Sequence, residues 1–454
     1  MLKKDFLLTT KTGACLYEKV KALPIIDYHN HLSLQDISEN KRYLDVYDLW
    51  IAPDPYKHRA MRMCGVAEEY ITGNADKEEK FVKWCETLPK LFLHPLFHWS
   101  YMEMEKLFGV TEKIDGENAR KLYAYCNEYL QKKEITVGAL LQDFGVEYAC
   151  PCASLTDELS VFGGDCRFAP SLRGDDILLP SEKLLRVLEK QTGIVVDTLS
   201  NYKQAIAVRL DEFEKYNCRF SDHALDNGFY FYEEDGENDA RFLALCKGEL
   251  DKEGRGKLFS HLLVFMAREY AKRGFVMQLH IGAERFTSSK LREKAGAAGG
   301  FAGIGNSVDI ASLTKFLDEV DCSADGLPKT MLFTLNPADN AMLSVLSGSY
   351  SKDGMEGLVT QGPAWWWCDH KQGIVEMLEN TSVFGLLLNF VGMTTDSRSF
   401  LSFARHDYFR RVLCDWLGEK WESGELFCAQ EEVGNLTYQL CYGNAKKIVN
   451  KEEK

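Results

Sequence analysis

The chain has 454 residues, of which 45% are hydrophobic and 27% are charged, as is ordinary for a globular protein. Its net charge of -14 repels phosphate backbones and argues against a general nucleic-acid-binding role, although local arginines would still allow it to bind an anionic metabolite. Its 14 cysteines are too sparse for a disulfide scaffold and include no CxxC pair, so we expect reduced thiols and a cytoplasmic protein.

The first five residues are not followed by the long apolar segment of a signal peptide. The longest apolar stretch, residues 382–393, is too short to cross a bilayer, so we expect no membrane partner. At about 150 residues per domain the length would suggest roughly three domains. No repeat or linker divides the chain, however, which favours a single domain over residues 1–454.

Eight short apolar runs follow one another along the chain, and most of them end in polar residues. They are residues 23–27, 146–151, 168–172, 218–221, 275–279, 330–335, 359–363 and 390–393. Charged, helix-length segments separate most of them, which indicates βα units and a buried parallel sheet. Residues 40–140 form a longer gap with helix-like apolar spacing. The predicted fold class is α/β, a (β/α)8 TIM barrel with a helical insertion after strand 1.

His29-Asn30-His31 follows the first run, and in a strand residues i and i+2 point to the same side. Both imidazoles can therefore reach one metal ion. Asp396 follows the last run, which neighbours the first in a closed barrel, so its carboxylate could complete the site. Such ligands suit Zn2+, or Mn2+ as a harder substitute. The spacing alone leaves open two histidines satisfied by backbone groups and an aspartate that caps a helix.

Further polar residues end the middle runs. His280 and His223 stand where strands would deliver a side chain to the barrel mouth, as a ligand, a substrate contact or a buried histidine; His280 is preferred. Arg173 and Arg398 offer guanidinium groups that match a carboxylate, with a structural ion pair as the alternative. Trp366, within Trp365-Trp366-Trp367, could stack on a sugar. Cations at helical spacing after the last run are interpreted as structural or interfacial: Arg405, His406, Arg410 and Arg411.

Longer motifs extend over about residues 26–445. They are Gln278-Leu279-His280-Ile281-Gly282-Ala283, Asp222-His223, Leu335-Asn336-Pro337, Ala364-Trp365-Trp366, Gly385-Leu386-Leu387, Val391-Gly392-Met393, and the segments 395–400 and 405–411. In these motifs the chain resembles the uronate (glucuronate) isomerase family of the amidohydrolase superfamily. That family interconverts aldose and ketose hexuronates, D-glucuronate with D-fructuronate and D-galacturonate with D-tagaturonate.

The resemblance implies roles for individual residues. A divalent metal would be bound by His29, His31 and Asp396. Catalysis would involve Asp396, Tyr56, Arg398 and His280, and the substrate would contact Arg173. From their places at the ends of the runs, we also expect Trp366 and His223 to contact the substrate. Isomerisation moves a proton from C2 to C1 through an enediol, which requires a base and a group that stabilises negative charge. We assign Asp396 as the base that opens the sugar ring.

Several positions depart from the family pattern. Pro55 replaces the usual histidine beside Tyr56, and His58 replaces a tryptophan. Residues 150–157 replace Thr-Thr-Asp-Asp-Pro, so an acidic pair is absent, and Gly174 replaces a proline. These departures indicate a divergent member. They keep two alternatives open, a metal-dependent hydrolase of a sugar lactone or ester and a catalytically silent barrel that binds a sugar acid. No motif defines an oligomer, although barrels of this size often form homo-oligomers.

Overall fold

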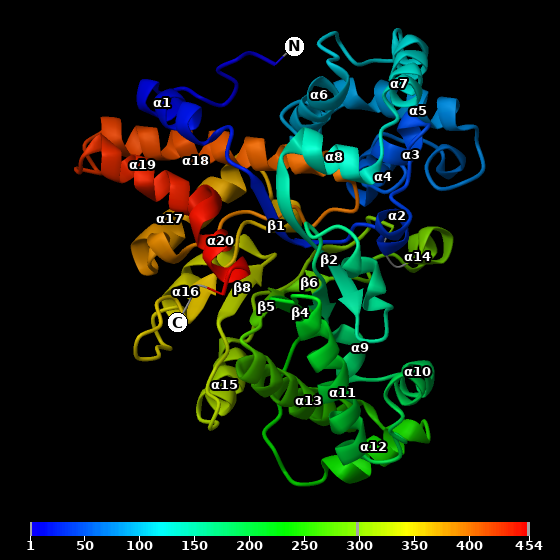
Figure 1. Ribbon diagram of the computed structural model, residues 1–454, viewed down its shortest axis with the longest axis vertical. Coiled ribbons are helices and arrows are strands. Elements are labelled where there is room, and N and C mark those ends of the chain that lie inside the picture. Colours follow the sequence, from blue (N-terminus) through cyan, green and yellow to red (C-terminus); the bar gives the residue numbers. More distant parts are fainter. Residues whose placement is uncertain (1, 297–298, 452–454) are drawn as a thin grey trace.

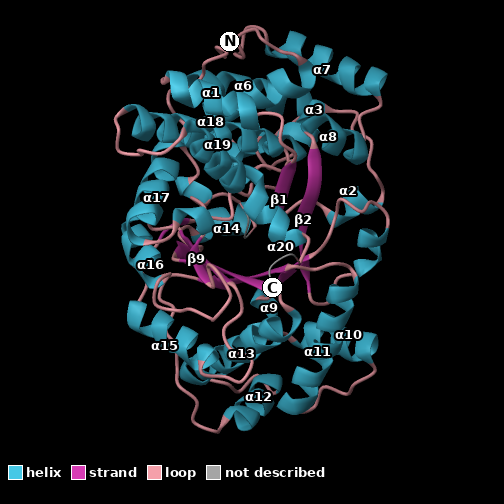
Figure 2. Ribbon diagram, turned by 60° about the vertical axis from the view of Figure 1, so that its left-hand side comes forward, coloured by secondary structure: helices cyan, strands magenta, loops and turns pink. Residues whose placement is uncertain are grey.

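A curled sheet of seven parallel strands forms the centre of the computed structural model, which describes residues 2–296 and 299–451. The strand order is β1-β2-β3-β4-β5-β8-β9. Helices surround the strands (Figures 1 and 2). The strands are β1 (Ile25–Asn30), β2 (Val146–Ser154), β3 (Ser171–Arg173), β4 (Phe220–Leu225), β5 (Val276–Ile281), β8 (Thr330–Thr334) and β9 (Val359–Gln361). Each of the first seven predicted runs overlaps one of them.

The eighth predicted run, residues 390–393, is not a strand, so the prediction of eight strands is wrong at this point. Gly392 has a φ of 94° and Asp396 a φ of 46°, and both values interrupt an extended backbone. The segment nevertheless lies against β1: the Asp396 N–H donates to His29 O at 3.1 Å, and the His31 N–H donates to Ser397 O at 2.8 Å. The result is a seven-stranded, TIM-like half-barrel whose open side this segment covers.

Alternate strand residues pack on opposite faces of the sheet, as the two-residue period of a strand requires. The inner face carries one apolar cluster, with members that include Ile26, Tyr148, Phe220, Val276 and Phe333. Neighbouring residues on the other face, such as Ile25, Ala149 and Leu332, belong to the larger cluster between sheet and helices. The core therefore has two parts, and the inner one closes the barrel below the carboxyl ends of the strands.

Between β1 and β2 the chain forms helices and turns, apart from one isolated bridge between Arg42 and Thr136. These helices lie together beside β1 and β2 in the upper part of Figure 1. They are α2 (Leu34–Ser38), α3 (Val46–Trp50), α4 (Pro55–Met63), α5 (Lys77–Thr87), α6 (Pro95–Phe108), α7 (Ala119–Lys133) and α8 (Val137–Phe144).

Most of the other helices cover the outer face of the sheet or pack on each other, as α1 does along α18 (Figure 1), whereas Ala445 and Ile448 of α20 belong to the inner apolar cluster. They are α1 (Lys11–Val20), α9 (Asp175–Leu178), α10 (Glu182–Thr192), α11 (Leu199–Lys215), α12 (Asn238–Cys246), α13 (Lys252–Arg273), α14 (Ser289–Ala295), α15 (Ile310–Asp321), α16 (Asn340–Leu346), α17 (Lys371–Phe384), α18 (Ala404–Glu422), α19 (Gln430–Tyr438) and α20 (Asn444–Val449). A short antiparallel pair, β6 (Ala283–Glu284) and β7 (Gly303–Ile304), follows β5. Within residues 2–296 and 299–451, no helix has the length and apolar character needed to traverse a bilayer.

A buried ion cluster holds the start of α4 in place. Lys57 Nζ lies 2.8 Å from Asp54 Oδ2 and 3.1 Å from Glu103 Oε2, and all three side chains are almost fully buried. Asp54 also caps α4, because its Oδ1 accepts the backbone N–H of Tyr56 at 2.9 Å. Trp50 Nε1 donates to Glu103 Oε2 at 2.6 Å. The cluster therefore ties the position of Tyr56 to the packing of α3, α4 and α6.

Candidate active site

A cavity of about 600 Å³ opens at the carboxyl ends of the strands. This is the end of a parallel barrel at which active sites form, because loops from several strands converge there. All but one of the predicted site residues line it: His29, His31, Tyr56, Arg173, His280, Trp366, Asp396 and Arg398. The fold therefore brings together side chains that are up to 369 positions apart in the sequence, from His29 to Arg398.

Two imidazoles and a carboxylate meet at the centre of this cavity. Asp396 Oδ1 lies 3.3 Å from His29 Nε2 and 3.0 Å from His31 Nε2. The second carboxylate oxygen, Asp396 Oδ2, accepts the indole N–H of Trp365 at 2.8 Å. His29 is buried, whereas His31 and Asp396 keep a small exposed fraction towards the cavity. The predicted cluster is therefore assembled, with Trp365 as an additional member.

A register shift in β1 directs the two histidines into the cavity. Asp27 pairs with Ala149 and Asn30 pairs with Pro151, so three steps along β1 match two along β2. Such a bulge reverses which side chains face inward, and bulges are common beside active sites for this reason. Ile26 faces the inside of the barrel. If the strand alternated regularly from there, His29 would point outward, towards the helices.

Asp27 anchors the segment that carries Asp396. Its Oδ1 accepts the backbone N–H of Thr395 at 2.7 Å and the Thr394 hydroxyl at 3.0 Å, and its Oδ2 accepts the Thr395 hydroxyl at 2.8 Å. His406 Nε2 lies 3.2 Å from Asp27 Oδ1. Asp27 is fully buried and lies two residues before His29 on β1. Its hydrogen bonds to Thr394 and Thr395 therefore fix the segment that carries Asp396 relative to the histidines of β1.

The charge of the cluster favours a cation. Burial raises the pKa of Asp396, but hydrogen bonds from His29 and His31 outweigh burial and hold that pKa well below its usual range. Burial lowers the pKa of His31 to about 4, so its imidazole is neutral at neutral pH. Around His29, by contrast, burial is outweighed by Cys152, Asp396 and Asp222, which raise its pKa. The same neighbours would attract a metal ion.

Two further groups at the cavity are held in their neutral forms. Burial, followed by the charge of Asp396, raises the pKa of Tyr56 well above its usual range, so the phenol stays protonated. Burial, followed by the charge of His29, lowers the pKa of His280 well below its usual range. Tyr56 can thus donate a hydrogen bond, and His280 can exchange a proton with a substrate.

The two arginines predicted for the site, Arg173 and Arg398, differ in their partners. Arg173 Nη2 donates to Asp175 Oδ2 at 3.1 Å, and its Nη1 lies 3.4 Å from His31 Nδ1. Arg398 is exposed at the cavity and pairs with no carboxylate within the described chain. Its guanidinium is therefore available to an anionic ligand.

His223 does not line the cavity, so the structure does not bring it together with the other predicted site residues. It is fully buried, and its Nε2 lies 2.8 Å from Tyr270 Oη, on the helix side of β4. The residue before it, Asp222, lines the cavity instead, because successive strand residues face opposite sides. Gly174 makes room for this histidine: a Cβ at position 174 would lie 2.0 Å from His223 Cε1.

Further side chains lie at the site. Cys152 Sγ lies 3.6 Å from both His29 Nδ1 and Asp222 Oδ1, and Arg285 lines the cavity. Cys152 lies near the carboxyl end of β2, the end of the strands at which active-site residues gather in a barrel, and this position is the signal for it. Pro55 lines the cavity, whereas His58 is buried outside it.

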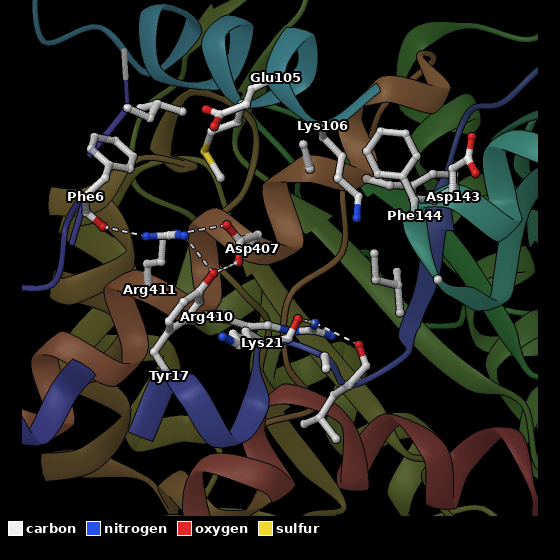
Figure 3. Close-up of a pocket in the computed structure, with 18 of the residues that line it drawn as sticks. Phe6, Tyr17, Lys21, Glu105, Lys106, Asp143, Phe144, Asp407, Arg410 and Arg411 are labelled. Atoms are coloured by element: carbon white, nitrogen blue, oxygen red, sulfur yellow. Dashed lines mark hydrogen bonds and ion pairs between the residues drawn. The ribbon is translucent and has the colours of Figure 1, made fainter. Parts of the chain in front are cut away.

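A larger cavity of about 900 Å³ lies at the opposite, amino-terminal ends of β1 and β2 (Figure 3). Its arginines are engaged: Arg411 donates to Asp407 and Tyr17, and Arg410 donates to the carbonyl of Leu23 at 2.8 Å. These contacts agree with the interpretation of both arginines as structural. Since no metal-type donor cluster lies there among the described residues, this cavity is not the candidate active site.

The residues at the carboxyl-end cavity fit a divalent metal. Imidazole and carboxylate are common ligands of Zn2+ and Mn2+. His280 Nε2 is buried and has no hydrogen-bond partner within the described chain, which is unusual unless a ligand or ion approaches it. A TIM-like half-barrel with these donors at its carboxyl end is the arrangement of a barrel enzyme with a candidate metal site.

Comparisons with known proteins place the chain within that class. The family model described as Glucuronate isomerase matches residues 1–449. A uronate isomerase of Bacillus licheniformis is 38% identical over all of this chain and 98% of its own length. A uronate isomerase of Endomicrobium trichonymphae is 36% identical over 98% of this chain and 97% of its own. The crystal structure of uronate isomerase from Thermotoga maritima has a TM-score of 0.92 at 28% identity, over 99% of each chain.

The chain therefore belongs to the glucuronate isomerase family and is an isomerase. The fold also resembles a glucuronate isomerase structure from Caulobacter crescentus, with a TM-score of 0.91 at 23% identity over 100% of this chain and 98% of that one.

Proposed function

We propose that the chain interconverts aldose and ketose hexuronates at the 600 Å³ cavity, D-glucuronate with D-fructuronate and D-galacturonate with D-tagaturonate. The observation that carries the proposal is the convergence of His29, His31 and Asp396 on one cavity with Arg398, which pairs with no carboxylate among residues 2–296 and 299–451. The relatives named uronate isomerase support this substrate class. The family match favours the isomerase over the alternatives of a lactone hydrolase and a silent sugar-acid-binding barrel.

His29, His31 and Asp396 would hold the divalent metal, which we propose to be Zn2+. When bound, the ion supplies a Lewis acid that holds and orients one end of the sugar acid. Arg173 and Trp366 would contact the substrate beside it, Arg173 through its guanidinium and Trp366 through its indole. The unpaired cysteines accord with a reducing compartment, and we place the protein in the cytoplasm.

Four side chains share the chemistry of the proposed reaction. Asp396 is an anion at neutral pH and takes the hydroxyl proton whose loss opens the sugar ring. His280 is neutral and would carry the proton from C2 to C1, while the O2 proton moves to O1. Tyr56 remains a phenol and donates to the enediol, and Arg398 offsets the negative charge that develops there.

Arg398→Met is expected to lower kcat/KM for hexuronates by roughly 10- to 100-fold, because the variant loses a charge-assisted hydrogen bond to the substrate. Arg398→Lys should recover part of this loss, because lysine keeps the positive charge but lacks the planar guanidinium that donates two parallel hydrogen bonds. Steady-state assays of ketose formation measure both. Arg186→Met, which alters an exposed arginine of α10, is the matched control and should change nothing. Unchanged kinetics in Arg398→Met would remove Arg398 from the site.

Removal of the metal is expected to reduce turnover at least about 100-fold, because several kcal/mol of barrier lowering come from a catalytic ion. The protein is dialysed against a chelator, its metal content is measured, and ketose formation from D-glucuronate and D-galacturonate is followed. Stoichiometric Zn2+ or Mn2+ should restore turnover. Full activity in protein shown to be metal-free would contradict the proposed metal dependence.

A further inference from the structure

A second cavity, of about 170 Å³, lies beside the active-site cavity, and Tyr56 and Trp366 line both of them. Three basic side chains also line the second cavity: Arg59 of α4, His94 before α6 and His370 before α17. No carboxylate lines it in the described part of the chain. In a protein with a net charge of -14, this cavity is therefore set apart by its positive character.

Arg59 presents a fixed positive charge to this cavity. Its Nη1 donates to Gly300 O and to Ala302 O, each at 3.2 Å. Its Cζ lies 4.6 Å from the centre of the Trp367 ring, so the guanidinium is held against an aromatic face. Burial lowers the pKa of Arg59, and no carboxylate among the described residues pairs with it. Because a guanidinium stays charged in a protein, this cation lacks a counter-ion.

His94 and His370 are the N-cap residues of two long helices. His94 Nδ1 accepts the backbone N–H of Leu96 at 3.2 Å, and His370 Nδ1 accepts that of Gly373 at 3.1 Å. A neutral imidazole that accepts at Nδ1 carries its proton at Nε2. Each ring therefore keeps an N–H donor, and neither donor has a partner within the described chain.

The surroundings of these histidines are positive. Burial, followed by the charges of His370 and Arg59, lowers the pKa of His94. Burial also lowers the pKa of His370, against the opposing charge of Glu376. The amino-terminal ends of α6 and α17 add partial positive charge of their own. Cationic groups and helix ends thus face one another here, and an anion would relieve their repulsion.

Two indole N–H groups add to the set of free donors. Trp99 and Trp367 line the same cavity, and their Nε1 atoms are buried without a hydrogen-bond partner in the described part of the chain. Buried donors without partners are unusual unless a ligand or water approaches them. This observation is independent of the charges and also points to a ligand that accepts hydrogen bonds.

We propose that the 170 Å³ cavity binds a small oxyanion, a carboxylate or a phosphate group, through Arg59, His94 and His370, at a site distinct from the metal site. Oxyanions accept several N–H bonds at once, and such charge-assisted bonds are the strong ones. The cavity is much smaller than the 600 Å³ of the active site and suits a compact acid. The proposal depends neither on metal binding nor on isomerisation. The competing explanation is that the two histidines only cap their helices.

Isothermal titration calorimetry of the metal-loaded protein with inorganic phosphate and with D-gluconate tests the proposal. D-Gluconate is a sugar acid without an aldehyde or ketone, so it cannot be isomerised. We expect saturable binding of at least one of the two anions, with a Kd of about 1 mM or tighter. Binding of phosphate alone would identify a phosphate-type ligand, and binding of D-gluconate would identify an organic acid.

His94→Asn and His370→Asn should each weaken binding at least about tenfold, because each variant loses one N–H donor to the anion. Asparagine keeps an oxygen that can cap the helix, so thermal unfolding should stay close to that of the parent. Arg59→Met should weaken binding at least as much. His261→Asn is the matched control and should bind like the parent, because His261 pairs with Glu234 outside the cavity.

Arg398→Met separates the two cavities. Arg398 lines the active site but not the second cavity, so this variant should bind the anion like the parent. Unchanged affinity in folded His94→Asn and His370→Asn would overturn the inference, and loss of binding in Arg398→Met would then place the anion in the active site. Absence of binding up to about 10 mM, which would fill about nine-tenths of a site with a Kd of about 1 mM, would overturn it as well.

Discussion

Asp396→Asn is expected to abolish hexuronate isomerisation and leave the fold intact. Asparagine keeps the shape of the side chain and an oxygen for the Trp365 N–H, which lies 2.8 Å from Asp396 Oδ2. It loses the negative charge that faces His29 and His31, and it cannot act as a base. Loss of a general base alone lowers kcat by about 10²- to 10⁴-fold, and weakened metal binding adds to this. Initial rates of ketose formation measure the effect.

The same preparation provides the control for folding. Because the substitution leaves the hydrogen bonds of the main chain in place, thermal unfolding of Asp396→Asn should stay close to that of the parent. Asp211→Asn, at an exposed aspartate paired with Arg273, should retain full activity. Full activity in a folded Asp396→Asn protein would contradict the assignment of Asp396 to both metal binding and catalysis.

Lys57→Met is expected to destabilise the protein by about 3–5 kcal/mol, because it leaves buried carboxylates without their cation. Lys57 is fully buried and bonds to Asp54 and Glu103, which are also buried. The free energy of unfolding from denaturant titrations measures the loss. The loss should shrink as pH falls, since protonation removes the buried negative charges.

Lys77→Met is the matched control for Lys57→Met. Lys77 pairs with Asp48 at the surface, where the two side chains are 50% and 37% exposed. Exposed pairs contribute about 0–1 kcal/mol, so this variant should be nearly as stable as the parent. Equal stability of the two variants would show that the Lys57 cluster does not support α4.

The parallel sheet and the main cluster of the site could be predicted from the sequence because their signals are local. Seven apolar runs coincide with strands, and the His29-Asn30-His31 spacing lies at the end of the first. The first and last strands of a closed barrel lie side by side, and this predicts that Asp396, after the last run, lies beside these histidines. The backbone hydrogen bond from Asp396 to His29 O confirms that neighbourhood, although the last run is not a strand.

The other features of the site could not be predicted, because they depend on three-dimensional geometry that the order of residues along the chain does not show. The bulge in β1 changes which side chains face inward, and it leaves no mark in composition. Residue type favours His223 as a site residue, whereas strand alternation places Asp222, and not His223, at the cavity. The contacts of Trp365 with Asp396 and of Lys57 with Glu103 join segments distant in sequence, which only the folded chain brings together.

Proton exchange at C2 of a hexuronate tests the central claim most directly. Metal-loaded protein is incubated in D2O with D-glucuronate and with D-galacturonate, and the C2 proton is followed by NMR. The proposed function predicts loss of the C2 proton signal together with appearance of the ketose, and neither event in Asp396→Asn. An unchanged C2 proton, with a folded protein that holds its metal, would contradict isomerisation of these sugar acids at this site.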